Sequence, residues 1–566
     1  MSAAPSPGLA PDSADPRFYY LRNFQFALAW IGARYDDVLG AEERAFIAAF
    51  AAMPRSARAL MARMLMRRGP LFRGGTLRYD EIGCPVAASR HLVAEGWVDA
   101  EPVLDLDEAA RLLRRGELQR LLPPDVPAKG LTKPRIVEWL RLNAATPRVW
   151  TAWDNSGDFA LRILVAPLIE RLRLMFFGNL RQEWSEFIVA DLGIVQYERV
   201  PFPDSARAFH TREDVDAYLW LHGARQELEE GTSPAAALLD AVLQKSFDSP
   251  WLRHRHAKLR FLIGRQLERE ARWHEAHRAY DGCDHPEARH RLARVLEQQG
   301  LHAAALAFAL DATRMPRNET ETQALGRLIT RQQRRLGLSK DEARGRPAIA
   351  VDTLTLPAPA SPRPVEYVVR DHLATPDAPV FYVENTLINA LFGLLCWDAV
   401  FEPLPGAFFH PFQRGPADLH APDFHARRAT AFAARLGRLD DGSYKDAILA
   451  NFDAKAGIQS PFVFWGALDR DVLDLALRCI PAAHLKLWFH RILQDVGANS
   501  SGLPDLIRFV PARAEYELIE VKGPGDRLQD NQRRWMAYNA AHGVPVRVCR
   551  VKWMGAGQAA AITPSA

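Results

Sequence analysis

Three charged residues in the last quarter of the chain have the types and spacing of a phosphodiester-cleaving site. Asp505 opens a short apolar run, while Glu520 and Lys522 alternate on one face of a second run that is rich in β-formers. Both runs show the period-2 pattern of strands, so we expect a hairpin. A tip at Ala512 and Arg513 places Asp505 directly opposite Glu520, with Cβ atoms about 5 Å apart. Two carboxylates so placed offer the oxygen ligands that a hard cation such as Mg²⁺ takes.

The chemistry that uses this set is metal-assisted hydrolysis of a phosphodiester. A bound metal lowers the pKa of water, and the Lys522 ammonium adds a fixed positive charge beside the attacking oxygen. The plain alternative is a surface hairpin in which Glu520 and Lys522 form an ion pair. The position of Asp505 favours the site, as does a following helical pattern with Gln532 and Trp535 on one face.

A second block of sequence lies upstream of the hairpin. It reads ENTLINALFGLLCWD at 384–398 and is followed by FHPFQ at 409–413 and PADL at 416–419. The 502–535 stretch resembles the VRR-NUC division of the restriction-endonuclease-like nucleases. With the upstream block included, the chain resembles the bacterial form of the Fanconi-anaemia-associated nuclease family.

This resemblance implies further parts of the site. In such nucleases a glutamate on the first helix of the domain completes the metal site, and Glu384 is the matching position. The resemblance also implies the Val521 carbonyl as a further ligand, Mg²⁺ or Mn²⁺ as the cofactor, and Gln532 as a group that orients Lys522 or the scissile phosphate. Locally, Glu384 heads a helical stripe of otherwise apolar positions, which aims its carboxylate at the buried side. The alternative is a first-turn glutamate favoured by the helix dipole.

Composition and charge place the chain among ordinary globular proteins. It has 566 residues, 48% hydrophobic and 25% charged, and a net charge of +4. The five cysteines form no Cys-x-x-Cys pair, so neither a disulfide framework nor a zinc site is indicated. No run approaches the roughly eighteen apolar residues of a membrane span. Residues 1–16 lack the order of a signal peptide, so we expect a disordered leader on a cytoplasmic, nucleoid-associated bacterial protein.

Because the net charge is small, DNA binding must come from local basic patches. In the predicted N-terminal DNA-binding region, 17–148, an arginine-rich helical stretch includes Arg63, Arg67 and Arg68 and runs into a strand, a helix and a further strand. This order suggests a winged-helix arrangement whose arginines contact phosphates. The alternative is a solvated helix face.

A helix, an extended loop and a second helix follow at about 106–142, which is the pattern of a SAP-like DNA-binding module. The resembled family carries such a module in this place. Its candidate phosphate contacts are Lys129, Lys133 and Arg135. A plain helical hairpin fits the pattern almost as well.

The rest of the chain divides by composition. We interpret 149–211 as a connecting core and 212–345 as an α-solenoid of short helices that resembles tetratricopeptide repeats, either a cradle for DNA or protein or a spacer. The proline-rich segment 346–364 is a predicted linker. The predicted nuclease domain, 365–556, carries a helical insertion at about 400–500.

The expected architecture is thus multidomain and predominantly α, with a C-terminal α/β restriction-endonuclease-like nuclease domain. In the resembled family, the inserted helices block dimerisation, which implies a monomeric nuclease domain acting on one strand of a flap or fork. Beyond the hairpin, Arg527, Arg533 and Arg534 are candidates to line the DNA track, or they are solvated helix charges.

The function that we predict is a Mg²⁺- or Mn²⁺-dependent, structure-specific DNA nuclease acting on branched or flapped double-stranded DNA. It is a 5′-flap endonuclease with 5′-to-3′ exonuclease action, of the phosphodiesterase I type, in DNA repair and specifically in repair of interstrand crosslinks. One alternative is a Holliday-junction resolvase, which dimerises and makes symmetric nicks. Another is a DNA-binding repair scaffold whose nuclease is incidental.

Overall fold

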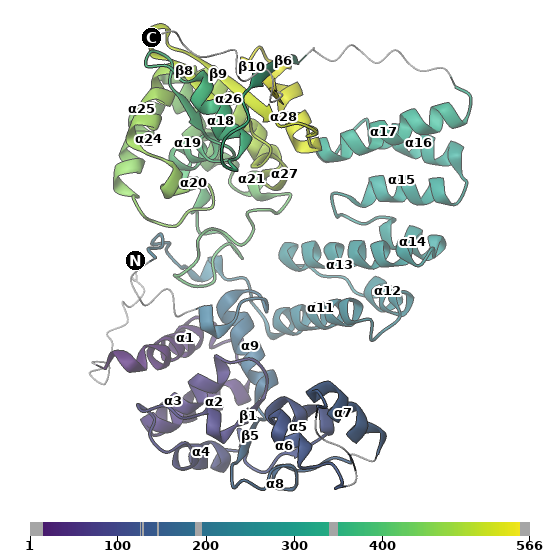
Figure 1. The fold of residues 1–566 in the computed structure, drawn as a ribbon, viewed down its shortest axis with the longest axis vertical. Coiled ribbons are helices and arrows are strands. Elements are labelled where there is room, and N and C mark those ends of the chain that lie inside the picture. The colour runs from purple at the N-terminus through teal and green to yellow at the C-terminus, as the bar shows by residue number, and fades with distance from the viewer. Residues whose placement is uncertain are drawn as a thin grey trace. The chain divides into compact units, whose positions relative to one another are not determined.

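A computed structural model describes most of the chain and divides it into two compact units. The described residues are 15–124, 126, 130–143, 146–186, 195–338 and 349–554, so the expected leader lies almost wholly outside them. One unit comprises Met1–Val195 with Arg207–Leu219, and the other comprises Gln196–Ala206 with Trp220–Ala566 (Figure 1). Within the described ranges, no helix combines the length and the apolar character needed to cross a membrane.

The first unit begins with helices that pack around an aromatic core and a small sheet. The ring centroids of Phe46 and Trp97 lie 4.3 Å apart, and those of Phe24 and Phe50 lie 5.2 Å apart. The sheet has the order β1-β5-β2 with antiparallel pairings, and α3 packs on α4. The elements are α1 (Tyr19–Tyr35), α2 (Ala41–Ala52), α3 (Arg55–Leu65), β1 (Leu71–Arg73), α4 (Pro85–Ala94), β2 (Val98–Asp99), β5 (Ala160–Ile163) and α9 (Ala166–Phe177). Helices flanking a small sheet are the expected winged-helix arrangement.

One predicted boundary in this unit is wrong. The segment 149–211 was expected to be a connecting core, yet β5 is the central strand of the N-terminal sheet and α9 packs on α1 and α2. Four residues are too few to show a periodic pattern, and the partner strand β1 lies far upstream in the sequence, so the pairing leaves no local signal.

A smaller module is inserted between β2 and β5. Its helices enclose an apolar core that includes Leu118, Ile136 and Trp150. Asp105 accepts a hydrogen bond from the backbone N–H of Glu108, whose side chain in turn accepts from the Asp105 N–H, and this capping box starts α5. Its elements are β3 (Val103–Leu104), α5 (Leu106–Leu112), α6 (Arg115–Gln119), α7 (Lys133–Leu142), β4 (Arg148–Val149) and α8 (Trp150–Trp153).

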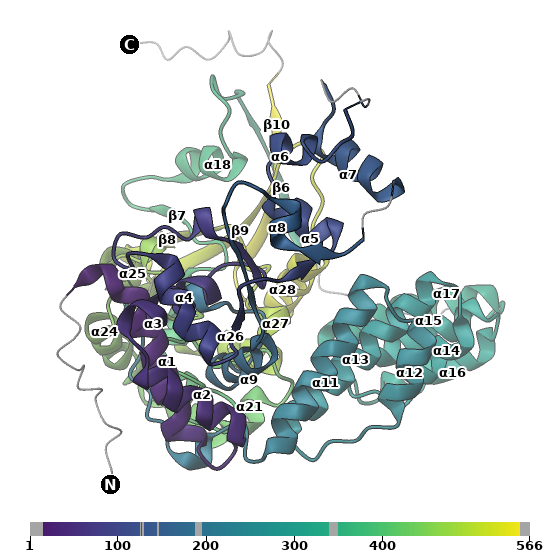
Figure 2. The ribbon, with the colours of Figure 1, turned by 90° about the horizontal axis from the view of Figure 1, so that it is seen from below.

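Helices alone form the middle of the chain, as the sequence indicates. Each helix from α12 onward packs on the next, and Figure 2 shows α13, α15 and α17 in one row with α12, α14 and α16 in another. A Cβ at Gly264 would lie 2.6 Å from the Tyr280 ring, so glycine permits the close approach of α13 and α14. The helices are α11 (Arg212–Glu230), α12 (Ala235–Leu243), α13 (Pro250–Arg269), α14 (Trp273–Tyr280), α15 (Ala288–Gln298), α16 (His302–Ala312) and α17 (Glu319–Arg335). This stack is the expected α-solenoid.

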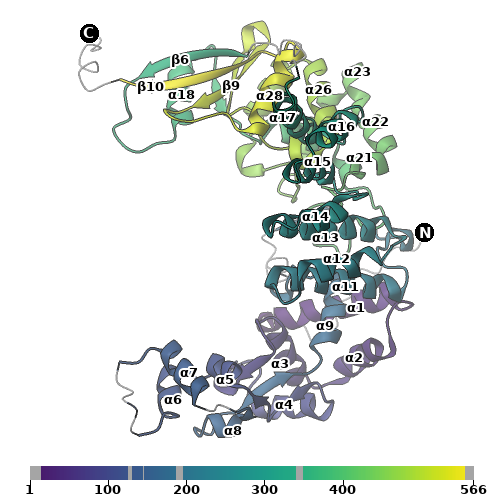
Figure 3. The same cartoon turned by 90° about the vertical axis from the view of Figure 1, so that its right-hand side faces the viewer.

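The last part of the chain is built on a mixed sheet of order β6-β10-β9-β8-β7. The pairs β7–β8 and β8–β9 are antiparallel, while β9–β10 and β10–β6 are parallel. One face carries Ile519 and Val521 and packs on α18, while the other carries Tyr516 and Leu518 and packs into a large core with the inserted helices (Figure 3). The strands are β6 (Ala350–Leu356), β7 (Val380–Tyr382), β8 (Leu506–Val510), β9 (Glu515–Lys522) and β10 (Val546–Trp553), and α18 spans Val365–Leu373.

Helices between β7 and β8, most of them in the insertion, cover the second face of this sheet. They contribute fully buried aromatic side chains such as Phe392 and Trp488 to the core. The helices are α19 (Leu387–Leu395), α20 (Trp397–Val400), α21 (Phe424–Arg427), α22 (Ala429–Leu436), α23 (Arg438–Asp441), α24 (Tyr444–Ala454), α25 (Arg470–Cys479), α26 (Ala482–Gln494) and α27 (Val496–Asn499), and α28 (Asp530–Ala541) follows the hairpin.

The predicted linker at 346–364 is wrong in part. Residues 350–356 form β6, the edge strand that pairs with β10 along seven residues. Nearly all of β6 is exposed, so its sequence carries no apolar alternation, and the prolines that follow it made the whole segment resemble a linker.

Candidate active site

The predicted hairpin forms, and its register is the predicted one. Leu506 pairs with Ile519, and the ladder runs to Val510 opposite Glu515. The tip is a 3₁₀ turn, η7 (Pro511–Arg513), closed by Ala514 in the left-handed conformation at φ 51°. Asp505, one residue before the ladder, therefore comes opposite Glu520.

Asp505 is held across the hairpin by a backbone hydrogen bond. Its side chain is 5% exposed, and its Oδ2 accepts from the Val521 N–H at 2.8 Å. Burial raises the pKa of its carboxyl above the usual range. The same contact fixes the amide of Val521; the Val521 carbonyl as a metal ligand stays a prediction.

Glu520 is fully buried and has one partner, the neighbouring lysine. The Lys522 Nζ lies 2.7 Å from Glu520 Oε1, while Glu520 Oε2 has no hydrogen-bond partner among the described residues. Burial, and then the charge of Asp505, raises the pKa of the Glu520 carboxyl. A buried carboxylate with a free oxygen is costly unless a cation compensates it.

Every other buried carboxylate that the structure describes is paired with arginine. Glu520 and Asp505 are the exceptions, since neither has an arginine partner among the described residues. The paired ones are Glu43 with Arg171 and Arg212, Asp154 with Arg73, Glu297 with Arg331, Glu321 with Arg289, and Asp418 with Arg427 and Arg428. Among the described residues that are buried as a whole, the two acids that face each other across the hairpin are thus the ones without arginine; the half-buried Glu402 also has one buried oxygen without a hydrogen bond.

Glu384 is close to this pair but does not lie on a helix. It occupies the turn between β7 and α19, because Asn385 has a φ of 53° and α19 begins only at Leu387. The Glu384 carboxylate accepts from the Tyr382 hydroxyl at 2.5 Å. Its charge raises the pKa of both Asp505 and Glu520, which places the three carboxylates in one electrostatic neighbourhood. The expected helical position of Glu384 is wrong by one turn; its role as a ligand stays a prediction.

The chemistry of the donor set fits a divalent cation. Among the described residues, no three His, Cys, Asp or Glu side chains converge closely enough to hold a metal as they stand. Asp505 and the unpartnered Oε2 of Glu520 supply two carboxylates, while the Glu384 carboxylate is held by the Tyr382 hydroxyl. Tyr382 is a site residue that the sequence analysis missed, because only the pairing of β7 with β8 brings it here.

Gln532 caps its own helix. It is buried, and its Oε1 accepts from the Gln529 N–H at 2.9 Å at the start of α28. Before this helix, Asp526 accepts from the Gly523 N–H at 3.1 Å and closes the preceding turn. A role for Gln532 toward Lys522 stays a prediction.

The three arginines near the hairpin that are candidate DNA contacts differ in exposure and in bonding. Arg527 and Arg533 are exposed. Arg534 donates to Gln323 Oε1 of α17 at 2.8 Å, so it joins the solenoid to α28. Arg527 and Arg533 are therefore the two of this group that are open to a phosphate.

The candidates in the first unit divide in the same way. Arg63 pairs with Glu81 at 2.6 Å and lies 3.8 Å from the centre of the Tyr20 ring. Arg67 donates to the Thr76 carbonyl at 3.0 Å, and Lys133 Nζ donates to the Leu113 carbonyl at 2.8 Å. Arg67, Arg68 and Arg135 are exposed, and of these Arg67 makes the bond to Thr76; Lys129 lies outside the described residues.

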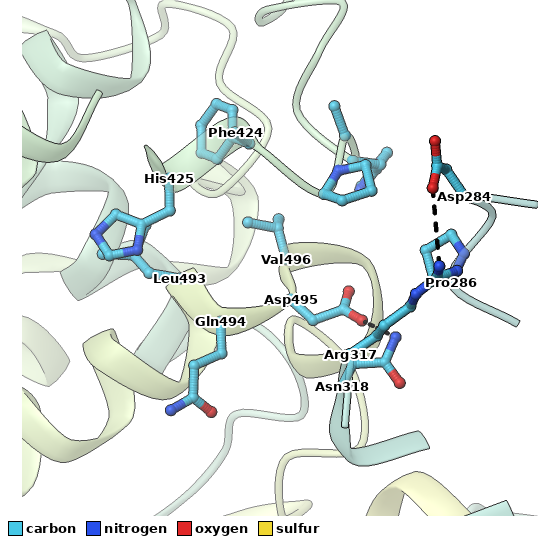
Figure 4. A pocket seen from close by; sticks show the side chains of 13 residues that line it. Asp284, Pro286, Arg317, Asn318, Phe424, His425, Leu493, Gln494, Asp495 and Val496 are labelled. Carbon is cyan, nitrogen blue, oxygen red and sulfur yellow. Dashed lines mark hydrogen bonds and ion pairs between the residues drawn. The ribbon is translucent and has the colours of Figure 1, made fainter. Parts of the chain in front are cut away.

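A separate cavity of about 310 Å³ lies between the solenoid and the inserted helices (Figure 4). Polar groups on its wall contact one another: Asn318 donates to Asp495 Oδ2 at 3.1 Å, and Arg317 lies 3.8 Å from Asp284. None of the predicted site residues lines it. The Asp505–Glu520 pair is therefore the candidate for chemistry.

Family models match three parts of the chain. The model described as "FAN1, HTH domain" matches residues 18–99, and the "Fanconi anemia-associated nuclease SAP domain" matches 103–153. The "VRR-NUC domain" matches 439–553, which includes the hairpin and α28.

Full-length similarity extends to named proteins and solved structures. The Fanconi-associated nuclease 1 homolog of Pseudomonas aeruginosa is 48% identical over 553 residues, covering 97% of this chain and 98% of that protein. The Arabidopsis thaliana homolog is 23% identical, covering 94% and 67%. The crystal structure of paFAN1 bound to 5′-flap DNA with a 2-nucleotide flap and a gap is similar with a TM-score of 0.90 at 47% identity, covering 96% of this chain and all of that one.

The N-terminal helices and small sheet, the SAP module and the nuclease hairpin follow one another in the order that these matches give, and the similarity covers nearly the whole chain. The chain therefore belongs to the Fanconi-associated nuclease 1 family and is a nuclease that hydrolyses phosphodiester bonds.

Proposed function

We propose that this protein is a divalent-metal-dependent, structure-specific nuclease that cuts branched DNA near the base of a 5′ flap. The observation that carries the metal dependence is the Asp505–Glu520 pair, two facing buried carboxylates without arginine partners. A cation between them removes the cost of their burial. Oxygen ligands favour Mg²⁺ or Mn²⁺ over softer metals.

The residues of the chain have distinct parts in the reaction. When bound, the metal supplies an activated water and charge neutralisation at the scissile phosphate. Asp505 and Glu520 hold it, with Glu384 as the third carboxylate. Lys522 pairs with Glu520, and its ammonium would supply a fixed positive charge beside the scissile phosphate and the attacking oxygen.

The choice of DNA substrate rests on relatives. The similar solved structures are of paFAN1 bound to 5′-flap DNA with flaps of 1 and 2 nucleotides. Near-complete coverage at 47% identity supports the same substrate class for this chain. We further propose 5′-to-3′ exonuclease action and a role in the repair of interstrand crosslinks on the bacterial chromosome.

Cleavage of end-labelled DNA tests the proposal directly. Wild type and Asp505→Asn are compared on 5′-flap, 3′-flap, four-way-junction and plain duplex DNA, with Mn²⁺ or with EDTA. We expect incision of the 5′ flap with Mn²⁺, none with EDTA, and none by the variant, which keeps the shape of the side chain but removes its charge. Symmetric cutting of the junction would instead favour a Holliday-junction resolvase. Binding of flaps without any cleavage would favour a DNA-binding repair scaffold.

A further inference from the structure

The face of the sheet that carries the catalytic pair continues past Lys522 onto two further strands. In the parallel pairing of β9 and β10, Val548 is in register with Glu520, and Arg550 with Lys522. Registered residues on neighbouring strands point to the same face of a sheet. Arg550 and, two residues on, Lys552 therefore lie on the active-site face.

The side chains of Arg550 and Lys552 are exposed, and neither has a carboxylate partner among the described residues. The structure gives neither Arg550 nor Lys552 an ion pair or a side-chain hydrogen bond within the described ranges. Their partners on β6 are Thr353 and Thr355, which are also exposed and uncharged. This part of the face is thus positive and open.

The opposite face of the same strand shows the contrast. Arg547 is in register with Ile519, so it lies on the α18 side of the sheet. There it pairs with Asp352 of β6 and, at 2.9 Å, with Glu517 of β9. Carboxylates on both flanking strands neutralise this arginine, whereas no described carboxylate forms an ion pair with Arg550 or Lys552 on the active-site face.

Protection of a sheet edge does not account for the two cations. Lysine on an edge strand discourages pairing with another chain. The edge strand is β6, however, and β10 lies inside the sheet between β6 and β9. Arg550 and Lys552 thus do not protect an edge strand, and their position suits contact with a ligand on the face of the sheet.

We propose that Arg550 and Lys552 bind the backbone phosphates that flank the scissile phosphodiester, so that the cut strand runs across β9 and β10 toward β6. Neighbouring strands lie about 4.8 Å apart and residues i and i+2 about 6.6 Å apart, which puts both cations within side-chain reach of the phosphates next to Lys522. This inference rests on the proposed function, since it names what the same site holds.

Salt dependence of DNA binding tests the role of the cations. Binding of a 5′-flap DNA is measured by fluorescence anisotropy in EDTA over a range of salt for wild type, the double variant Arg550→Gln/Lys552→Gln and the control Arg547→Gln. The double variant is expected to bind at least about tenfold more weakly and to lose about 2 from the slope of log K against log salt. The control keeps the wild-type slope. A double variant with the wild-type slope would overturn the proposal.

A second measurement locates the phosphates and guards against a folding defect. Neutral methylphosphonate linkages are placed on either side of the scissile phosphate. Wild type should lose affinity for this DNA, and the double variant should bind modified and unmodified DNA equally; equal losses in both proteins contradict the proposal. The charge-keeping variant Arg550→Lys/Lys552→Arg should restore the salt slope. Failure of wild type to cut flaps would refute the proposed function but not the phosphate contacts, because the salt slopes of binding are measured in EDTA without cleavage.

Discussion

At the scale of single residues, the site is distinguished by what its carboxylates lack. Elsewhere the described part of the fold gives each buried acid an arginine, as for Glu43, whose pKa its two arginines lower despite burial. Asp505 and Glu520 have raised pKa values instead, with burial as the first cause. A divalent cation would stabilise the charged forms that burial disfavours, so these shifts support the proposed metal site.

A pH dependence of metal binding follows from these shifts. Burial raises the pKa of Asp505 to about 6 and that of Glu520 to about 8. Because the folded-state values are raised, these groups contribute stability that is fully present below their unfolded values near pH 4 and is lost as the pH rises to about 8. A metal that binds at about pH 6 has to displace protons from these carboxyls, and at about pH 8 it has to displace fewer. We expect Mn²⁺ to raise the Tm more at the higher pH.

Differential scanning fluorimetry in EDTA and in Mn²⁺ measures this effect. The Glu520→Gln variant, which has no titrating group at 520, should show a smaller gain from Mn²⁺ and little difference between the two pH values. An equal gain for wild type at both pH values would contradict the assignment of the two carboxylates as ligands.

Lys522 is expected to act on the reaction and not on the fold. Its side chain is 14% exposed and its described partner is Glu520. Lys522→Ala should lower the single-turnover rate on flap DNA by about 100-fold or more, the usual effect of removing one charge-stabilising group, with DNA affinity changed little. Lys486→Ala, which removes an exposed lysine paired with Asp440, serves as the control and should keep the wild-type rate. A rate loss shared by both variants would contradict the assignment.

At the scale of elements, the sequence predicts what is local. The hairpin register could be predicted because one tip and two alternating runs determine it, and the facing of Asp505 and Glu520 followed. The start of α19 could not be predicted, because Asn385 adopts a left-handed conformation. Its side-chain oxygen accepts a hydrogen bond from the Leu503 N–H, 118 residues away. The same limit applies to β5 and β6, short strands whose partners lie far off in sequence.

Docking of the last solenoid helix on the nuclease helices is a second non-local feature. Arg491 of α26 is buried, and its guanidinium lies 4.6 Å from the Trp535 ring centre and 4.2 Å from that of Tyr538, both on α28. Both of its terminal nitrogens contact the carboxylate of Glu319 at the start of α17. Because α28 also carries Gln532, this arginine links the solenoid to the helix beside the site.

Replacing that arginine should therefore loosen both helices. We expect Arg491→Met to lower the free energy of unfolding by about 2 kcal/mol, less than for a pair buried at both ends because Glu319 is 37% exposed. Arg327→Ala removes an exposed ion pair to Asp530 between the same helices and should cost under about 1 kcal/mol. Hydrogen exchange should speed up in α17 and α28 for the first variant only. Equal effects of the two variants would show that the buried arginine has no special part.

At the scale of the whole molecule, the helix-turn-helix and SAP matches lie in the first unit of the chain, and the hairpin with the proposed site, the Asp505–Glu520 pair, lies in the second. The exposed candidates Arg68 and Arg135 belong to the first unit and have no part in the Asp505–Glu520 pair. Phosphate contacts raise affinity without touching the reacting atoms.

Affinity and rate should consequently separate between the two units. The double variant Arg68→Gln/Arg135→Gln is expected to bind flap DNA several-fold more weakly, with a salt slope smaller by about 2, and to keep the wild-type single-turnover rate at saturating DNA. Asp505→Asn should keep the wild-type affinity and lose the cleavage rate, because it removes a proposed metal ligand and no phosphate contact. Titration by anisotropy in EDTA and quenched-flow cleavage in Mn²⁺ measure the two quantities. A fall in the saturated rate of the arginine variant would mean that the first unit also positions the scissile phosphate, and unchanged binding would mean that these two arginines do not contact the DNA.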